Sequence, residues 1–180
     1  MRYNAEKDTF NKGCVQVYTG DDKGKTTAAI GLAVRALGAG MRVYFAQFLK
    51  GGDYSEKNIL GTLDNLVFRQ FGRNGFIARK PSDEDRAMAC RGVQEAGEAL
   101  RSGAYGLVIL DEVNVACSLG LITKDDVLSL LRERRDMTEL VLTGRNAAQE
   151  LLDAADLVSE VRNVKHYFAS GIQARRGIES

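Results

Sequence analysis

The chain has 180 residues, of which 44% are hydrophobic and 27% are charged, and its 25 basic and 24 acidic residues leave a net charge of +1. This length and composition predict one globular domain that is large enough to bury a core. The balanced charge gives no overall attraction toward nucleic acid or an anionic membrane surface, so we expect neither as a partner.

The N-terminal segment and the cysteines indicate where the protein works. Residues 1–12 have mixed charge and little apolar content, which is typical of a flexible arm, so we predict that the domain covers residues 13–180. No stretch approaches the roughly 20 apolar residues of a membrane span, and no signal peptide is evident. Three scattered cysteines, Cys14, Cys90 and Cys117, favour neither disulfides nor a zinc site, and we expect a soluble, cytoplasmic protein.

The first motif along the chain is a glycine-rich loop between a predicted strand, residues 14–18, and a predicted helix, residues 24–37. In such a loop, successive backbone N–H groups and the helix N-terminus converge on an anion, which predicts binding of a polyphosphate. The predicted nucleotide-binding residues are Gly20, Asp21, Asp22, Lys23, Gly24, Lys25, Thr26 and Thr27.

Individual roles follow from the residue types in this loop. We expect Lys25 to reach the phosphate oxygens and Thr26 to offer its hydroxyl to Mg²⁺, while Gly24 lets the backbone approach. The spacing departs from the usual pattern of about four residues before the Gly-Lys pair, because only three separate Gly20 from Gly24 and Thr19 takes the first-glycine position. A variant turn is therefore expected. A chance glycine turn with a solvated lysine is the alternative.

The rest of the chain alternates between strand and helix patterns. Strands are predicted at residues 42–48, 66–71, 105–110, 139–143 and 157–161, and helices at 55–60, 83–101, 115–119, from 123 onward, and 147–154. Ser82 and Asp85 are expected to cap the helix at 83–101. This alternation predicts a single-domain α/β fold of the RecA-like, P-loop NTPase type, with a mostly parallel sheet and helices on both faces.

The carboxyl ends of parallel strands are where ligands bind in such a fold. The apolar run at residues 107–110 ends in Asp111 and Glu112, which is typical of the acids that hold Mg²⁺ in P-loop proteins. Thr26, Asp111 and Glu112 are therefore the predicted metal ligands. An acidic pair can also start a helix without binding metal.

Three cations, Lys50, Arg35 and Arg145, are candidate neighbours of the triphosphate or ordinary surface charges. Phe76, in the glycine-containing segment 72–80, belongs either to a folded loop or to an apolar lid over a flat ligand. The sole histidine, His166, has no carboxylate partner near it in the sequence, so a structural role is expected. Any chemistry would consist of positioning and electrostatic stabilisation of a phosphate compound.

Several segments together resemble one family, the ATP:corrinoid adenosyltransferases of the cobalamin pathway. They lie in order and at similar spacing between residues 13 and 179, and the most specific are Thr143-Gly144-Arg145-Asn146 and the C-terminal pieces. The matching segments are 18–29, 46–51, 71–72 with 75–76, 107–112, 139–146, 154–158, and 165–166 with Gly171, Ala174 and 177–179.

The resemblance implies that a reduced corrinoid, as a Co(I) nucleophile, attacks C5′ of ATP and expels the whole triphosphate, in adenosylcobalamin synthesis or salvage. A metal-centred nucleophile needs no protein base, and none is evident in the sequence. Lys25, on the triphosphate, and Phe76, on the corrinoid side, are then the catalytic candidates. The substrates would be ATP and the corrinoid, and Mg²⁺ would be bound with them. The resemblance also implies a separate electron donor, such as a flavoprotein, and a homodimeric assembly.

Two departures from the family pattern accompany the resemblance. Asp22 stands where the family often has glycine, which would bring a carboxylate close to the phosphates, and the segment after Phe76 lacks the family's usual aromatic residue. Two other functions stay open: a RecA-like P-loop ATPase or phosphotransferase on another substrate, and an ATP-dependent corrinoid carrier without turnover. Complete cobalamin and an incomplete precursor are both candidate substrates.

Overall fold

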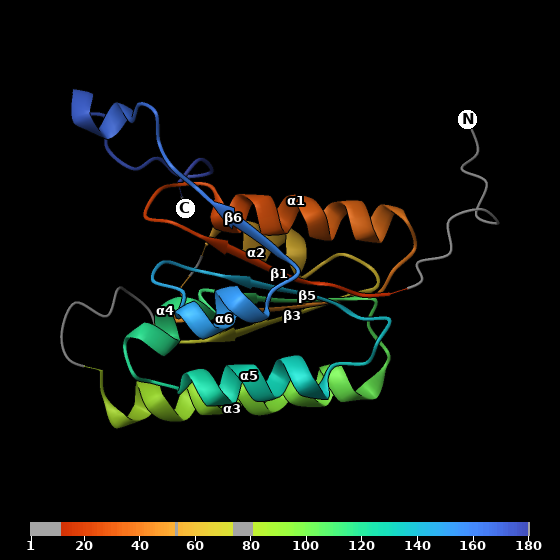
Figure 1. Ribbon diagram of the computed structural model, residues 1–180. Helices are drawn as coiled ribbons and strands as arrows, with labels where there is room; N and C mark the ends of the chain where they lie inside the picture. The colour runs from red at the N-terminus through yellow and green to blue at the C-terminus, as the bar shows by residue number, and fades with distance from the viewer. Residues whose placement is uncertain (1–11, 53, 74–80, 180) are drawn as a thin grey trace.

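The computed structural model describes residues 12–52, 54–73 and 81–179, and within them six strands form one sheet in the order β3-β2-β4-β5-β1-β6 (Figure 1). Every neighbouring pair is parallel. The predicted α/β fold is therefore confirmed. The strands are β1 (Val15–Thr19), β2 (Val43–Phe48), β3 (Leu66–Phe71), β4 (Leu107–Asp111), β5 (Glu139–Thr143) and β6 (Leu157–Glu160).

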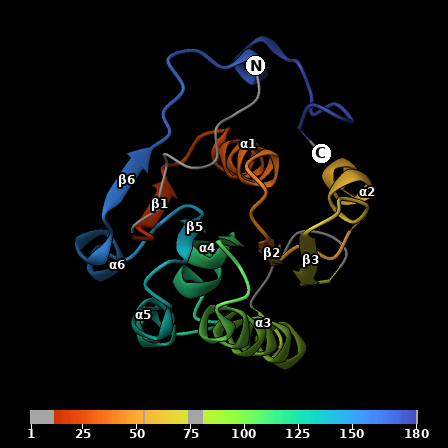
Figure 2. The same ribbon diagram turned by 90° about the vertical axis from the view of Figure 1, so that its right-hand side faces the viewer.

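Helices cover both faces of the sheet, as predicted, and Figure 2 shows the two layers end-on. One layer holds α1 and α2, and the other holds α3 and α5, with α4 and α6 beside them. None of these helices is long and apolar enough to cross a lipid bilayer within the part of the chain that the structure describes. The helices are α1 (Lys25–Gly38), α2 (Ser55–Leu60), α3 (Asp83–Ser102), α4 (Val113–Ser118), α5 (Lys124–Glu133) and α6 (Gln149–Ala154).

The central strand β2 shows why its sequence is apolar without alternation. All of its residues are buried. Val43 and Phe45 pack on the α1 side of the sheet, whereas Tyr44, Ala46 and Phe48 pack on the α3 side. Because successive side chains point to opposite faces and a helix covers each face, the strand needs apolar residues at nearly every position.

Small side chains bring α1 close to the sheet. Ala29, Ala33 and Ala36 are buried and lie on one face of the helix. The helix crosses β5 and β4 before the chain enters β2. The start of α1, where the glycine loop ends, is therefore held over the carboxyl ends of the central strands.

Most helices and strands begin and end within two residues of the positions that the sequence predicts. Ser82 and Asp85 form the predicted capping box at the start of α3. The helix α4 begins at Val113, two residues before the predicted start, because Glu112 adopts a left-handed conformation (φ 62°) that turns the chain directly from β4 into the helix. All three cysteines are free thiols. Only Lys12 of the predicted N-terminal arm falls within the described residues.

Two helical glycines test this packing in opposite directions. A Cβ at Gly92 in α3 would lie 2.8 Å from the Phe48 ring and 3.0 Å from the Phe71 ring, whereas one at Gly31 in α1 would meet nothing within 4 Å. We expect Gly92→Ala to lower the free energy of unfolding by about 1–3 kcal/mol through overpacking. Gly31→Ala should raise it by about 0.4–1 kcal/mol, because alanine restricts the unfolded chain. Urea unfolding measures both, and two changes of the same sign would contradict the packing.

Candidate nucleotide-binding site

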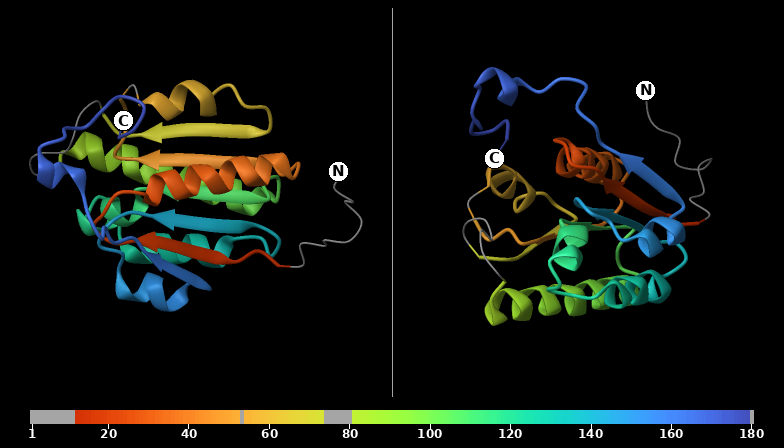
Figure 3. Two further views of the ribbon diagram at one scale, coloured as in Figure 1. Left: turned by 90° about the horizontal axis from the view of Figure 1, so that it is seen from above. Right: turned by 60° about the vertical axis from the view of Figure 1, so that its left-hand side comes forward.

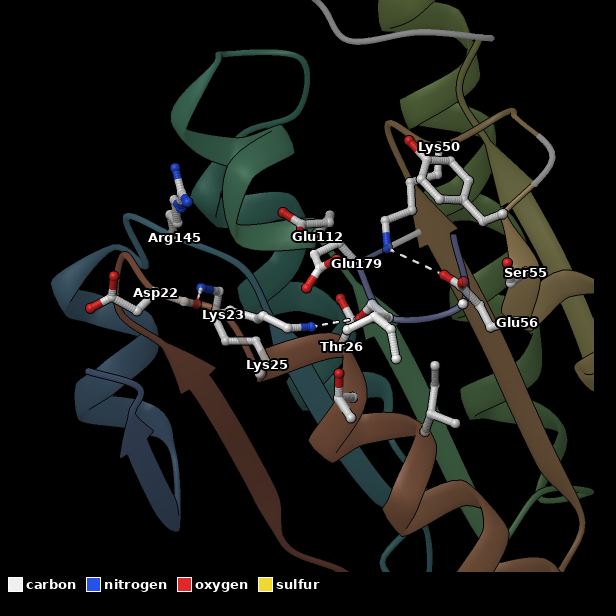
Figure 4. Close-up of a pocket in the computed structure, with 16 residues that line it drawn as sticks. Asp22, Lys23, Lys25, Thr26, Lys50, Ser55, Glu56, Glu112, Arg145 and Glu179 are labelled. Carbon is white, nitrogen blue, oxygen red and sulfur yellow. Dashed lines mark hydrogen bonds and ion pairs between the residues drawn. The ribbon is translucent and has the colours of Figure 1, made fainter. Parts of the chain in front are cut away.

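The loops that follow β1, β2, β4 and β5 meet at the carboxyl edge of the sheet, as the sequence predicted. They border a cavity of about 570 Å³, which is within the range of small-molecule sites (Figure 4). Of the predicted nucleotide-binding residues, those that line it are Asp22, Lys23, Gly24, Lys25, Thr26 and Thr27.

The glycine loop wraps around the ammonium group of Lys25. The Lys25 Nζ donates hydrogen bonds to the backbone carbonyls of Gly20 at 2.6 Å and Asp22 at 2.7 Å. Gly20 (φ 97°) and Gly24 (φ 133°) supply the left-handed conformations that this turn requires. Burial lowers the pKa of Lys25, and the nearby carboxylate of Glu112 opposes that shift. Lys25 thus lies at the cavity wall, and its contact with phosphate stays a prediction.

A buried carboxylate, Asp111, organises the site beneath the loop. Its side chain has no exposed surface. Its Oδ1 accepts hydrogen bonds from the hydroxyls of Thr26 at 2.8 Å and Thr143 at 2.6 Å. Its Oδ2 accepts bonds from Lys50 Nζ at 3.0 Å and Gln47 Nε2 at 3.1 Å. The predicted pair Thr26 and Asp111 is therefore in direct contact.

Thr143 connects Asp111 to the turn that follows it. While its hydroxyl donates to Asp111, the same oxygen accepts a bond from the backbone N–H of Glu112 at 3.0 Å. This bond supports the left-handed conformation of Glu112 and directs its side chain to the cavity lining. Burial, together with the charge of Asp111, raises the pKa of Glu112.

Two of the three candidate cations line the cavity. The Nζ of Lys50 lies 3.0 Å from the Oδ2 of Asp111 and 3.7 Å from the Oε1 of Glu56. Figure 4 marks the ion pair with Glu56 by a dashed line. Burial alone would lower the pKa of Lys50, but the two carboxylates outweigh it and the pKa is raised. Arg145 also lines the cavity, at the end of β5. Arg35 does not, because it lies in the last turn of α1, about 15 Å along the helix axis from Lys25. It is exposed, as in the alternative of an ordinary surface charge.

Other predicted residues have different placements. Asp21 is exposed and is not part of the cavity lining. Asp22 binds Asn163 through its carboxylate, and Lys23 binds the Ile178 carbonyl. His166 has the expected structural role, since its Nδ1 accepts a bond from the Phe168 N–H at the start of a short 3₁₀ helix, Tyr167–Ser170. Phe76 lies outside the described residues, so its role stays a prediction.

Sequence reasoning missed several contributors to the site. Gln47 is a polar residue in an otherwise apolar buried strand, and its Nε2 also bonds Glu56 at 3.1 Å. That break in an apolar run was a usable signal, because buried amides need partners. Tyr54 and Glu56, after β2, and the C-terminal residues 177–179 also line the cavity. Their positions depend on contacts distant in sequence.

A strand, a glycine loop and a helix, with a buried acid at the end of a neighbouring parallel strand, define a P-loop nucleotide-binding protein. Comparison with known proteins narrows this class. The family model of the ATP:corrinoid adenosyltransferases BtuR/CobO/CobP matches residues 11–180. The chain therefore belongs to the ATP:corrinoid adenosyltransferase family, a family of enzymes, and the resemblance seen in the sequence is confirmed.

Individual relatives agree with this family. The chain is 37% identical to a corrinoid adenosyltransferase of Sinorhizobium sp over 175 residues, which are 95% of this chain and 82% of that protein. It is 37% identical to the corrinoid adenosyltransferase of Escherichia coli (strain K12) over 170 residues, 93% of this chain and 86% of the relative. Corrinoid adenosyltransferase CobA of Salmonella typhimurium is 36% identical, with the same coverage.

Replacement of Lys25 tests the nucleotide site directly. We expect Lys25→Ala to weaken the binding of ATP in the presence of Mg²⁺ by at least about 100-fold, because a charged contact to phosphate in a sheltered site is lost. Isothermal titration calorimetry measures the affinity. Lys57→Ala is the matched control, since Lys57 is exposed on α2 and outside the cavity lining. An unchanged affinity in Lys25→Ala would remove the basis of the assignment.

Replacement of Thr143 tests the network around Asp111. Thr143→Val keeps the shape but leaves an oxygen of Asp111 and the N–H of Glu112 each short of a partner, so we expect the free energy of unfolding to fall by about 1–3 kcal/mol. Thr62→Val is the control, because the Thr62 hydroxyl bonds the Ile59 carbonyl on an exposed turn. Its cost should stay within about 0.5 kcal/mol. Equal losses in urea unfolding would count against the network.

Proposed function

We propose that the protein transfers the 5′-deoxyadenosyl group of ATP to the cobalt of a reduced corrinoid. The Co(I) centre supplies an electron pair to C5′, a cobalt–carbon bond forms, the C5′–O bond breaks, and triphosphate leaves with the electrons of that bond. Cobalt is formally oxidised from Co(I) to Co(III). The observation that carries this proposal is the family match over residues 11–180 of a chain whose glycine loop borders a cavity.

The chain's cations fit a role on the leaving triphosphate. Lys25, Lys50 and Arg145 all line the cavity; Lys25 begins α1, and the other two follow β2 and β5. Positive charge fixed in place before the reaction favours the transition state, because negative charge on the triphosphate grows as the C5′–O bond breaks. The protein then contributes orientation and charge rather than a proton acceptor, which agrees with a cobalt nucleophile.

Mg²⁺ fits the oxygen atoms that the cavity presents. Thr26 and Glu112 line the cavity, and Asp111 accepts a hydrogen bond from Thr26 beneath it. We propose these three residues as its holders, since Mg²⁺ prefers oxygen ligands and commonly shares phosphate oxygens with few protein groups. Bound there, Mg²⁺ would supply charge neutralisation to the triphosphate.

The remaining parts of the proposal concern partners and location. Co(I) requires a reductant, and we propose an external donor such as a reduced flavoprotein. The family resemblance also supports a homodimer and a corrinoid contact through Phe76. Three free thiols in the described chain favour a reducing compartment such as the cytoplasm.

Product analysis tests the function. The protein is incubated with ATP, Mg²⁺, a chemical reductant and either cobalamin or a corrinoid precursor. The expected products are intact triphosphate and a corrinoid with the absorption of a cobalt–carbon bond. Both should be lost on chelation of Mg²⁺. The corrinoid that is adenosylated faster is identified as the substrate. ADP and phosphate without alkylation would instead identify an ATPase or phosphotransferase. ATP-dependent corrinoid binding without turnover would identify a carrier.

A further inference from the structure

The carboxylate of Asp22 is bound to the C-terminal segment of the chain, residues 163–179. Its Oδ2 accepts a hydrogen bond from the backbone N–H of Asn163 at 2.8 Å, and its Oδ1 accepts one from the Asn163 side-chain amide at 2.8 Å. We name these two bonds the Asp22–Asn163 clasp. In Figure 4 the Asp22 side chain points away from that of Lys25. Both carboxylate oxygens thus have partners outside the glycine loop.

The next loop residue, Lys23, makes a second connection to the same segment. Its Nζ donates to the backbone carbonyl of Ile178 at 2.7 Å. The neighbouring Glu179 accepts bonds from the Tyr167 hydroxyl and, at 2.6 Å, from the Arg175 N–H, which folds the end of the segment back on itself. Through this fold, residues 177–179 form part of the cavity lining.

Both connections tie the C-terminal segment to the glycine loop. It leaves the sheet beside the glycine loop, where a Cβ on Gly20 would lie 2.4 Å from the Val161 carbonyl oxygen, and it then arches over the carboxyl edge (Figure 3). Beyond Arg162, the clasp and the bond from Lys23 join residues 163–179 to the glycine loop.

We propose that Asp22 and Asn163 are positioning residues: the clasp fixes the C-terminal segment so that residues 177–179 form a wall of the triphosphate site. This inference rests on the proposed nucleotide site but not on the transfer to cobalt. It explains how a carboxylate is accommodated where the family often has glycine. Asp22 acts through the segment that it holds, and the phosphates are left to Lys25 and the loop N–H groups.

The opposite hypothesis is that Asp22 acts on the phosphates by charge. A carboxylate beside a triphosphate repels it, so removal of the charge would then strengthen ATP binding. The clasp predicts the reverse, because loss of the wall weakens binding. The two hypotheses therefore differ in the sign of the effect of one substitution.

The test is a double-mutant cycle on ATP affinity, measured by calorimetry with Mg²⁺ present. We expect Asp22→Ala to weaken ATP binding about tenfold, the size of one or two charge-assisted hydrogen bonds. Asp22→Asn and Asn163→Ala, which each keep part of the clasp, should weaken it by about threefold. The double variant Asp22→Ala/Asn163→Ala should match Asp22→Ala alone, because one interaction is removed in each. Tighter binding in Asp22→Ala and Asp22→Asn, or additive effects, would overturn the proposal.

Hydrogen exchange provides a readout that general destabilisation would not reproduce. In Asp22→Ala, amides of residues 163–179 should exchange faster while those of the central strands are unchanged, and ATP should slow exchange of this segment in the unmodified protein. Arg162→Ala is the matched control: it removes an exposed ion pair with Glu160 just before residues 163–179 and should leave ATP affinity within about twofold. Unaltered exchange of residues 163–179 in Asp22→Ala would contradict the clasp.

These measurements separate failure of this inference from failure of the proposed function. ATP affinity and hydrogen exchange need no corrinoid, so they remain informative if no adenosyl transfer is found. If transfer is found, the clasp variants should raise KM for ATP with little change in kcat, since the wall affects binding rather than the attack on C5′. A fall in kcat with unchanged KM would contradict the positioning role.

Discussion

The buried carboxylate of Asp111 is the constraint on which the site depends. An ionised group without solvent contact is tolerated only when its oxygens are fully hydrogen-bonded. The donors come from the first turn of α1, from β2 and the loop after it, and from β5. The hydrogen bonds to this one carboxylate thus align the glycine loop with the ends of β2, β4 and β5. The geometry of the cavity and the stability of the sheet edge are therefore properties of the same interaction.

Sheet topology makes this alignment possible. The chain leaves β1, crosses β5 and β4 as α1, and returns to the sheet at β2 on the far side of β4. The helix that begins at the glycine loop consequently starts above the end of β4, where Asp111 lies. Ligand sites in parallel α/β sheets recur at such crossings, because loops from neighbouring strands depart there in opposite directions.

The sequence predicted the features that short-range chemistry determines. The glycine loop, the Ser82–Asp85 capping box and the alternation of strands and helices each depend on neighbouring residues, and all were found. It could not separate Lys50 from Arg35, because a lysine in a loop and an arginine in a helix look equally exposed until the topology places one beside Asp111. The partner of Asp22 was equally hidden, since Asn163 lies 141 residues away.

At Glu112, backbone stability and the side chain presented to the cavity have opposite requirements. A residue other than glycine in the left-handed region costs about 1 kcal/mol, and here the Thr143 hydroxyl supports the turn through the Glu112 N–H. Selection for heat resistance alone would favour glycine at this position and would delete a cavity carboxylate in doing so. Engineering of a more robust enzyme should therefore hold position 112 constant and seek its gains elsewhere, at surfaces remote from the sheet edge.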